Sequence, residues 1–544
     1  MRSVIPSRWL RRGLQLVLLL GAFAFLTSNA QAQSPTMDEQ NHLARGYALL
    51  RTGDPRLSVE HPPLINLLES LPLGRGVALP LDQPCWENGD WYTFADLFLW
   101  KVNSKPDRMV FLGRMPIVGL TLLLGALAAR WARMLGGPVA GVVAPALTLL
   151  DPNILAHGSL ATTDLGIAFS SLLTAYVVWR VAHKPTPLGI AASGVAVGAM
   201  LASKSSALVF WGSLGLLWVG SFIPFAPRRG LAKALASRGL HFLAITAVGL
   251  LVLWGTYAFQ VGPTTEGGPS LPMGTYWGGL AQIFRQVQGG RPSYLLGQTR
   301  LGGWPLYFPI TFGVKTPLPV LLLLPLAVFS PVADRRWRDT AFLLVPVTIY
   351  WFSALVSGLN LGYRHLLPTL PFLYVWVAQR LGRTGRVAWR RVGFALVAWL
   401  VVETAWIAPH FLAYFNPVGG GPEQGWRVVA DSNIDWGQDL KYLREYLDDG
   451  ALDEPVRLSW FGSSYPERYG IDYEPLPGVP HHFNLWFESP TFNEAQPEPG
   501  LYAISVSNLV ELYLTDKHFF EYFREREPDA RIGYSIYVYR VESE

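Results

Sequence analysis

Apolar segments long enough to cross a lipid bilayer recur along this chain, and they constrain its fold more than any other feature. A helix rises 1.5 Å per residue, so crossing the hydrocarbon core takes about 20 mostly apolar residues. We identify about eleven such segments. They run approximately over residues 13–30, 109–129, 138–155, 164–182, 187–203, 205–225, 242–260, 314–332, 340–358, 366–380 and 392–410. The sequence therefore predicts an α-helical polytopic membrane protein with about eleven transmembrane helices.

The composition excludes most other classes of protein. Charged residues make up 15% of the chain and apolar residues 50%, whereas an ordinary soluble domain carries about 25% charge. The 13% of aromatic residues excludes disorder, and a net charge of +5 gives no reason to expect a nucleic-acid partner. The single cysteine, Cys85, excludes an intrachain disulfide framework and a cysteine-based metal site.

Lysine and arginine predict the orientation, because they concentrate in cytoplasmic loops. The N-terminus and every second loop are basic. These residues are Arg2, Arg8, Arg11, Arg12, Arg130, Arg133, Arg180, Lys184, Arg228, Arg229, Lys233, Arg238, Arg335, Arg336, Arg338, Arg380, Arg383, Arg386, Arg390 and Arg391. The loops near 156–164 and 360–365 hold almost no positive charge. We therefore predict a cytoplasmic N-terminus and, after eleven spans, a tail on the opposite side.

The spans divide the chain into four parts. Residues 1–32 are a first span or a signal-like segment, because Ala30-Gln31-Ala32 resembles a signal-peptidase site. Residues 33–108 form a first extracytoplasmic loop. Residues 109–410 form the transmembrane core, and residues 411–544 form an extracytoplasmic domain.

Local patterns predict structure in the parts outside the membrane. The first loop is expected to hold helices at Glu39–Leu50 and Leu64–Leu71 that lie in the membrane interface. A second loop, 261–313, is rich in Gly and Pro and is expected to be irregular with a short helix. The tail combines one predicted helix with strand-like runs, which is typical of a small mixed α/β domain. These elements are expected near Asp439–Leu447, Val456–Phe461, Leu501–Val506 and Tyr534–Val541.

Ionisable residues gather at the predicted extracytoplasmic ends of the spans. Such groups are costly near lipid and indicate function. They are Asp38, Glu39, Asp151, Asp164, Lys204, Lys315, Arg364 and His365. Carboxylates and cations on one lipid-bordered surface predict a reaction at the outer membrane face, on a substrate that is itself partly lipid.

Each of these residues also has a structural interpretation. Asp38, Glu39 and Asp164 fit the first turns of helices, where acids are favourable. Lys204, Lys315 and Arg364 fit long basic side chains that extend to lipid headgroups. His61 and His365 fit ordinary loop histidines. The run from Asp431 to Asp439 fits a turn followed by a capped helix.

A metal site has little support in the sequence. The histidines are spread over separate segments, and no His-x-x-x-His pattern occurs on a helix. The residues concerned are His61, His365, His410, His481 and His482. A divalent ion held by carboxylate and histidine stays open as an alternative.

Several motifs together resemble a known family. They are Asp38-Glu39, His61-Pro62-Pro63-Leu64, Asp151-Pro152-Asn153-Ile154-Leu155-Ala156-His157, Thr163-Asp164, Ala202-Ser203-Lys204, Val314-Lys315-Thr316-Pro317-Leu318-Pro319, Gly362-Tyr363-Arg364-His365-Leu366-Leu367-Pro368, Ser432 to Leu440, and Trp460-Phe461-Gly462. In this order relative to the spans, they resemble the protein O-mannosyltransferases of glycosyltransferase family 39. That family belongs to a larger lipid-carrier-dependent class with a GT-C-type fold, which includes the bacterial aminoarabinose transferases.

The resemblance implies a bacterial inner-membrane enzyme that moves a sugar from a polyprenyl phosphate to an acceptor hydroxyl on a protein, lipid or glycan. It implies Asp38 and Glu39 as the catalytic acids. Asp38 would accept the proton of the acceptor hydroxyl in a single displacement that inverts the anomeric centre. The implied phosphate-binding residues are His61, Lys204, Lys315, Arg364 and His365, supported by Asp151 and Asp164. It implies no cofactor.

The chain departs from this family at two positions. The mannosyltransferases usually carry a lysine two residues after the His-Pro-Pro-Leu run, where this chain has Asn66. The aminoarabinose transferases carry a lysine directly before Pro-Pro, where this chain has His61. Phosphate recognition and the sugar are therefore expected to differ.

Two other functions fit parts of the sequence. A transporter or lipid flippase would place its site near the bilayer midplane, with repeat symmetry between its halves, and we find no internal repeat. A non-catalytic assembly or sensor protein would explain the tail. It would give no reason for the charges around the first loop.

Overall fold

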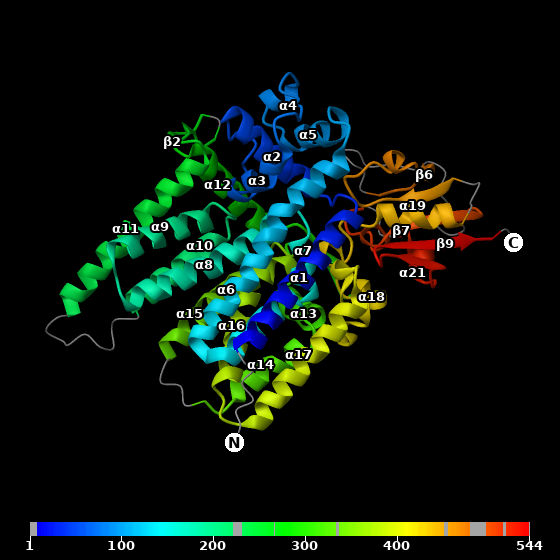
Figure 1. Cartoon of the computed structure of the whole chain (residues 1–544). Helices are drawn as coiled ribbons and strands as arrows, with labels where there is room; N and C mark the ends of the chain where they lie inside the picture. Colours follow the sequence, from blue (N-terminus) through cyan, green and yellow to red (C-terminus); the bar gives the residue numbers. More distant parts are fainter. Residues whose placement is uncertain are drawn as a thin grey trace.

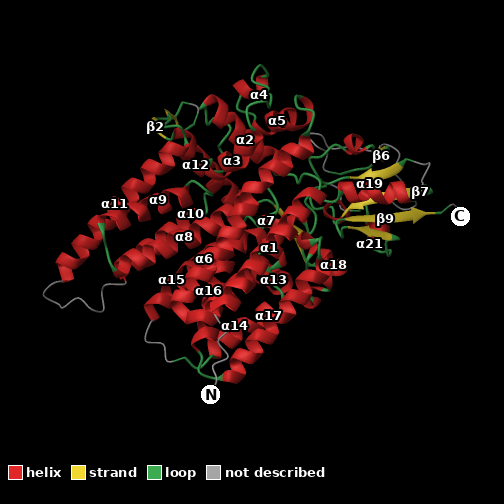
Figure 2. Ribbon diagram, viewed as in Figure 1, coloured by secondary structure: helices red, strands yellow, loops and turns green. Residues whose placement is uncertain are grey.

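A body of long helices running side by side makes up most of the molecule, with a small sheet at one end (Figure 1, Figure 2). This computed structural model describes residues 8–220, 231–265, 267–332, 337–450, 455–478, 497–514 and 518–542. The long helices are α1 (Arg8–Ala32), α6 (Pro106–Leu149), α8 (Thr163–His183), α9 (Pro187–Leu201), α10 (Ala207–Gly220), α11 (Leu231–Thr256), α14 (Leu318–Phe329), α15 (Trp337–Leu355), α16 (Leu370–Arg383) and α17 (Val387–Ile407). The predicted helical class and small mixed tail domain are confirmed.

Every predicted span overlaps a helix, but the number of membrane crossings stays a prediction. Among the described residues, four helices are long and apolar enough to cross a membrane, and five if one bent pair counts as a single span. The four are α1, α6, α8 and α11. Helices α9 and α10 are apolar but shorter. Residues Arg2, Arg228, Arg229, Arg335, Arg336, His481 and His482 lie outside the described residues.

Small and aromatic residues bring the central helices together. Helices α6 and α16 pack so closely that a Cβ atom on Gly136 would lie 2.7 Å from the Cα atom of Gln379. Beside this contact, Trp131 of α6 packs against Trp179 of α8 and Phe372 of α16. Trp131 is completely buried, as expected for a close-packed interior. This packing holds the helices whose ends carry the charged residues.

Residues 314–332, predicted as one continuous span, are divided between two helices. Helix α13 (Tyr307–Lys315) ends before Thr316, and α14 runs at an angle of 108° to it. The cause is Pro317, because proline disfavours helical backbone in the preceding residue and cannot donate an N–H bond. Thr316 is extended, with φ −75° and ψ 132°. The bend places Lys315 inside the protein.

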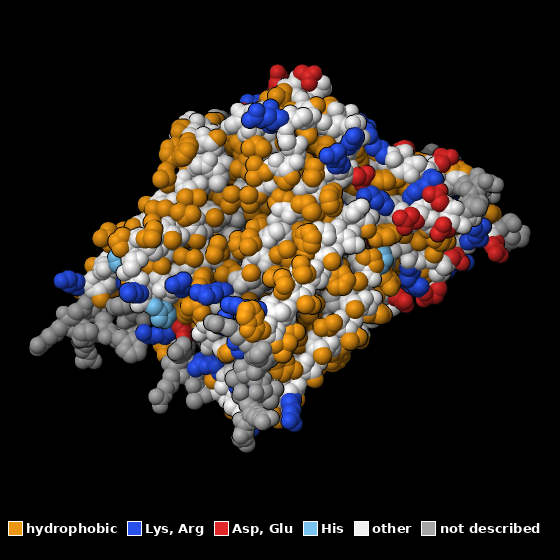
Figure 3. Space-filling view, in the orientation of Figure 1, with side chains coloured by type: hydrophobic (Ala, Val, Ile, Leu, Met, Phe, Trp, Pro, Cys, Tyr) orange, Lys and Arg blue, Asp and Glu red, His pale blue; other side chains and the backbone are white. Residues whose placement is uncertain are grey.

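The basic helix ends meet at one end of the bundle. The indole N–H of Trp179, near the end of α8, donates to Asp339 at the start of α15. Arg380, near the end of α16, donates to the carbonyls of Ala327 and Ser330 at the end of α14. Figure 3 shows Lys and Arg side chains gathered at this end, with a broad apolar surface beside it. The alternation of basic loops thus corresponds to one physical end of the bundle.

The first loop folds into a helical cap over the opposite end. Its elements are α2 (Glu39–Thr52), α3 (Leu64–Ser70), η1 (Leu71–Leu73), α4 (Pro84–Glu87), α5 (Trp91–Asp96) and η2 (Leu97–Lys101). The helices predicted at Glu39–Leu50 and Leu64–Leu71 are present as α2 and α3, and their place in the membrane interface stays a prediction. Helix α2 is buried from Glu39 to Leu49, and a Cβ atom on Gly46 would lie 1.9 Å from the carbonyl oxygen of Asn66. Glycine allows this contact, which places α2 inside the protein.

The second loop, predicted at 261–313, spans residues 257–306 between α11 and α13 and is more regular than predicted. It contains the hairpin of β1 (Val261–Pro263) and β2 (Ser270–Pro272), the helix α12 (Gly274–Gly289), and the hairpin of β3 (Pro292–Leu295) and β4 (Gln298–Leu301). Its glycines suggested an irregular chain, but they permit close packing. A Cβ atom on Gly279 would lie 2.0 Å from the carbonyl oxygen of Val59. Helix α12 therefore lies directly against the first loop.

The tail wraps from the bundle into a five-stranded sheet. Its helical elements are η5 (Phe411–Ala413), η6 (Pro417–Gly419), α18 (Gly421–Gln424), η7 (Gly425–Arg427), η8 (Asp431–Asn433), α19 (Leu440–Asp449), η9 (Pro466–Tyr469), α20 (Val506–Leu509) and α21 (Glu521–Arg524). Its strands are β5 (Val456–Ser459), β6 (Tyr473–Pro475), β7 (Gly500–Ser505), β8 (Ala530–Ile532) and β9 (Ile536–Val541). The order is β6-β5-β7-β9-β8, with β5 parallel to β6 and β7 and the other pairs antiparallel. Leu440 and Leu443 of α19 pack against this sheet.

Candidate active site

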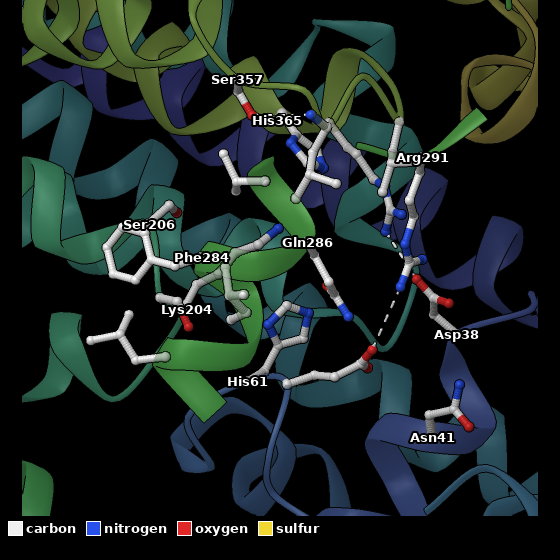
Figure 4. A pocket seen from close by; sticks show the side chains of 18 of the residues that line it. Asp38, Asn41, His61, Lys204, Ser206, Phe284, Gln286, Arg291, Ser357 and His365 are labelled. Atoms are coloured by element: carbon white, nitrogen blue, oxygen red, sulfur yellow. Dashed lines mark hydrogen bonds and ion pairs between the residues drawn. The ribbon is translucent and has the colours of Figure 1, made fainter. Parts of the chain in front are cut away.

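A cavity of about 1010 Å³ lies where the first loop, the second loop and the helix ends meet. Its polar part is lined by Asp38, Asn41, His42, Arg45, Glu60, His61, Lys204 and Arg364. Its apolar part is lined by side chains of α10, α12 and α15, among them Leu208, Val209, Leu280, Ile283, Phe284, Val287, Tyr350 and Ala354. Figure 4 shows the labelled side chains from these segments around one space. The cavity therefore joins a charged chamber to an apolar one.

Four charged residues from four separate segments form a continuous chain at this cavity. The carboxylate of Asp38 lies 3.0 Å from a guanidinium nitrogen of Arg364, and the same nitrogen lies 3.9 Å from the carboxylate of Asp164. Asp164 in turn accepts a hydrogen bond of 2.6 Å from the ammonium group of Lys204. The arrangement brings together residues that the sequence placed only on one side of the membrane. Alternating charges neutralise one another, which permits their burial.

Neither Asp38 nor Asp164 caps a helix with its side chain. Asp38 occupies the N-cap position of α2 and makes no side-chain capping bond. Asp164 lies in the first turn of α8, where Thr162 holds the N-cap position. Lys204 and Arg364 bind these acids and do not extend to the surface, since each side chain is 13–14% exposed. Asp164 therefore lies in a first helical turn as predicted, but neither acid acts as a side-chain cap and both bind these cations instead.

Arg364 keeps Asp38 ionised. Burial alone would raise the pKa of Asp38, but the guanidinium of Arg364 and, more weakly, His42 outweigh it and lower that pKa below its usual value. The guanidinium of Arg364 stands over Trp436, with its Cζ atom 4.3 Å from the ring centroid. Asp38 is thus a carboxylate at neutral pH, one third exposed, and it faces the cavity.

The two predicted histidines line the cavity without supplying positive charge. Burial and the neighbouring cation Lys204 lower the pKa of His61 well below its usual value, and that of His365 to about 3. His61 stands 5.7 Å from His42 in a stacked pair, measured between ring centroids. Both predicted histidines are neutral near pH 7, so each can donate one ring N–H to an anion but adds no charge.

Four predicted residues lie outside the cavity lining: Asp164, which reaches it through Lys204 and Arg364, and three others. Glu39 is completely buried and accepts two hydrogen bonds of 2.7 Å from Arg114. Asp151 caps α7 (Pro152–Gly158) by accepting from the N–H groups of Asn153 and Ile154. Lys315 is buried, and its ammonium group donates to the carbonyl oxygens of Leu412 and Asn433. Asp151 also accepts from the hydroxyl of Tyr374, and Glu39 from the hydroxyl of Thr36. The geometry therefore gives these three residues structural contacts.

Sequence reasoning missed a second charged group in the chamber. Arg45 of α2 donates a hydrogen bond of 2.7 Å to Glu60, and its guanidinium lies 4.0 Å from the ring centroid of Trp91. Arg291, after α12, lies 4.0 Å from the other oxygen of Glu60. One signal was available for Arg45. Asp38, Asn41, His42 and Arg45 follow helical spacing, which places them on one face of α2.

The tail also reaches the cavity. Tyr513 lines it and donates a hydrogen bond of 2.5 Å to Asp431. The predicted capped helix after Asp431 is present as α19, but Asp439 makes no side-chain capping bond. It accepts instead from Ser535, at 2.7 Å. The run from Asp431 to Asp439 therefore joins the sheet to the site and does more than start a helix.

No group of three or more His, Cys, Asp or Glu side chains arranged to hold a metal ion occurs within the described parts of the chain. His410 pairs loosely with Asp439, at 3.9 Å, and lies away from the cavity lining. His61 and His365, by contrast, both line the cavity.

Comparison with known proteins identifies the fold. Neither a family model nor a curated protein matches this sequence. A crystal structure of ArnT from Cupriavidus metallidurans bound to undecaprenyl phosphate is similar, with a TM-score of 0.50, 13% identity and 97% of each chain covered. The apo form of the same protein gives a TM-score of 0.49, with 13% identity and 97% of each chain covered. The oligosaccharyltransferase AglB from Archaeoglobus fulgidus, in complex with an inhibitory peptide and a dolichol-phosphate, gives 0.41 at 13% identity, covering 89% of this chain and 62% of that chain. The predicted family resemblance is thus confirmed at the level of the fold.

Proposed function

We propose that this protein is a membrane glycosyltransferase that moves a sugar from a polyprenyl-phosphate carrier to an acceptor hydroxyl. The observation that carries the proposal is the Asp38–Arg364–Asp164–Lys204 chain at the junction of a charged and an apolar chamber. A lipid-linked sugar phosphate has these same two parts. ArnT, which shares the fold, was crystallised with undecaprenyl phosphate, and this supports a lipid phosphate as the ligand.

We place the basic end of the bundle in the cytoplasm and the cavity at the outer face of a bacterial inner membrane. The alternation of basic loops supports this orientation. The first and second loops and the tail would then share the extracytoplasmic side. The apolar chamber, lined by α10, α12 and α15, would receive the isoprenoid tail, and the charged chamber would receive the sugar and phosphate.

In the proposed reaction, Lys204 and Arg364 bind the phosphate of the donor. Charge develops on this phosphate as the bond from the sugar to oxygen breaks, and cations held in place where water is scarce stabilise it. His61 and His365 add hydrogen bonds as neutral donors. Two cations can balance a monophosphate, so the proposal assigns no cofactor, and transfer in the presence of a chelator is expected to continue.

Asp38 would accept the proton from the acceptor hydroxyl as that oxygen attacks the anomeric carbon. One displacement of this kind inverts the anomeric centre. Binding of the phosphate to Arg364 competes with Asp38 for the same guanidinium, whose nitrogen is 3.0 Å away. The loss of this partner raises the pKa of Asp38 and makes it a stronger base when the donor is bound.

The proposal is tested by incubating the purified protein with a panel of polyprenyl-phosphate monosaccharides and an extract of candidate acceptors. We expect release of free polyprenyl phosphate from one donor, with the label of its sugar on a new product. If the correctly folded protein hydrolyses no donor of the panel and transfers sugar from none of them, the proposed activity is contradicted.

The pH dependence of kcat/KM should show how the ion pair with Arg364 lowers the pKa of Asp38. Activity requires ionised Asp38, so the acid limb lies below its ordinary pKa of about 3.9, and the wild type should be flat from pH 5 to 7. In Arg364→Gln the burial of Asp38 is uncompensated and its pKa rises. The acid limb should therefore move up into the measured range. Identical acid limbs for the two proteins would contradict the role of Arg364 in keeping Asp38 ionised.

Two lysines allow a matched comparison of donor binding. Lys204→Met removes a cavity cation, and we expect donor affinity to fall about 10- to 150-fold, the range for a charged hydrogen bond of about 1.5–3 kcal/mol. Lys315→Met removes a lysine bonded to two carbonyl oxygens outside the cavity lining. It should lower the unfolding temperature and leave the donor affinity of the folded fraction near wild type. Binding of a fluorescent polyprenyl phosphate measures the donor affinity of each variant. If the two variants lose the same donor affinity, Lys204 does not belong to the phosphate site.

A further inference from the structure

The second loop, residues 257–306, exposes an unusual number of large apolar side chains. They are Phe259, Val261, Leu271, Trp277, Leu296, Leu301 and Leu306, apart from Phe284, which is exposed at the cavity. In the tail, among its described residues after 411, Val418 is the one large apolar side chain that is exposed. Both regions lie outside the helical bundle, so this contrast indicates that they meet different surroundings. The first loop also exposes Leu50, Leu71, Leu81 and Val102. Isolated exposed apolar residues are ordinary, but the denser set in residues 257–306 indicates a contact surface.

These side chains belong to ordered elements, the β1–β2 hairpin before α12, the helix α12 itself, and the β3–β4 hairpin after it. The β1–β2 hairpin begins directly after α11, a helix apolar enough to cross a membrane, and the β3–β4 hairpin leads into α13. Apolar side chains cover the corner where β2 lies in Figure 1, as Figure 3 shows. The second hairpin is fixed, since the N–H of Leu296 donates to the carbonyl of Val428. The apolar surface is therefore part of the fold.

The charges of the same segment are mostly positive. Residues 257–306 contain three arginines and one glutamate. Arg285 and Arg300 are exposed, and the guanidinium of Arg300 lies 5.4 Å from the ring centroid of Trp304. Apolar and aromatic side chains beside exposed arginines are typical of segments in the interface of a membrane, where arginine meets lipid phosphate.

We propose that residues 257–306 dock onto the outer leaflet of the bilayer. The large apolar side chains insert at the boundary between headgroups and acyl chains, and Arg285 and Arg300 contact headgroup phosphates. The inference rests on the proposed function for its placement of this end in the outer leaflet. It goes beyond that function because Ile283 and Val287 of α12 line the cavity. The leaflet then supports a wall of the cavity from outside.

Because the chain has a single native cysteine, the depth of chosen positions in the bilayer can be measured with labels on introduced cysteines. In a Cys85→Ser background, we would introduce Leu271→Cys and Leu301→Cys in the second loop, and label each with an environment-sensitive fluorophore. Two matched positions complete the set. Val418→Cys in the tail is the water-exposed control, since Val418 is 71% exposed against 67% for Leu301, and Leu251→Cys on α11 is the membrane control. The full-length proteins would be placed in nanodiscs of phosphatidylglycerol and phosphatidylcholine with doxyl-labelled lipids.

We expect quenching at positions 271 and 301 to exceed that at 418 several-fold, with the shallow doxyl label more effective than the deep one. If position 251 is quenched while 271 and 301 match 418, the docking proposal is overturned and the membrane placement stands. If position 251 is not quenched either, the proposed membrane function fails with it. If the labelled variant at position 271 or 301 does not elute at the same volume as the unlabelled protein, Leu296→Cys takes its place. The second loop and the tail can then still be compared.

Discussion

Replacing Asp38 by asparagine is expected to reduce the rate of sugar transfer about 100- to 10,000-fold, the usual contribution of a general base. Asparagine has nearly the same shape as aspartate but cannot accept the acceptor proton. Donor binding should not weaken, because the variant frees Arg364 from its 3.0 Å ion pair. Turnover and binding of a polyprenyl-phosphate sugar, measured on the same preparation, separate the two effects.

Asp54→Asn provides the matched control for this prediction. Asp54 belongs to the same loop, pairs with Arg56 at the surface and does not line the cavity. It should transfer sugar at the wild-type rate. If Asp38→Asn also retained wild-type turnover, Asp38 would not be the base. If it lost donor binding in proportion to turnover, its contribution would lie in binding and the proposed chemistry would be wrong.

The largest effect on stability is expected at Glu39. Its carboxylate accepts from Arg114 and also from the N–H groups of Thr36 and Ala161. Arg114 also donates to the carbonyls of Ala30 and Ser34. Both side chains are fully buried, so Glu39→Gln leaves a buried guanidinium without its counter-charge. Breaking such a pair costs about 3–5 kcal/mol, and we expect a large fall in the thermal unfolding temperature in detergent.

A double substitution distinguishes a broken ion pair from a general packing defect. Glu39→Gln combined with Arg114→Met removes both charges, and replacing a whole buried pair by apolar groups is often tolerated. The double variant should therefore unfold at a higher temperature than Arg114→Met alone. Asp448→Asn, which removes an exposed partner of Arg444, should change the unfolding temperature little. Additive losses in the double variant would contradict a coupled pair.

The sequence predicted the helical body well because apolar length and basic loops are local signals. Asp38, Lys204 and Arg364 were placed on one side of the membrane from their positions at the ends of spans, and the structure brings them together. The residues around Asp38 left open whether it is a helix cap, and the gathering of charges at one membrane face favoured a functional acid. In this respect the candidate site follows from the positions of the helix ends.

The direction of each side chain could not be predicted. Glu39 is adjacent to Asp38, yet the next position on a helix points about 100° away, toward Arg114 and not the cavity. Lys315 turns inward because Pro317 ends α13 directly after it. Arg291 carried no local signal, since its place depends on α12 packing against the first loop through Gly279. These features depend on tertiary contacts between segments far apart in the sequence.

The central claim is that Lys204 and Arg364 bind the phosphate of a lipid carrier while Asp38 faces the acceptor. An experimental structure of the protein with a bound polyprenyl-phosphate sugar tests it most directly. We predict the phosphate within hydrogen-bond distance of Lys204 and Arg364, the isoprenoid chain along α10, α12 and α15, and Asp38 on the side of the anomeric carbon away from the phosphate. A phosphate bound elsewhere, with the Asp38–Arg364 pair untouched, would contradict the account.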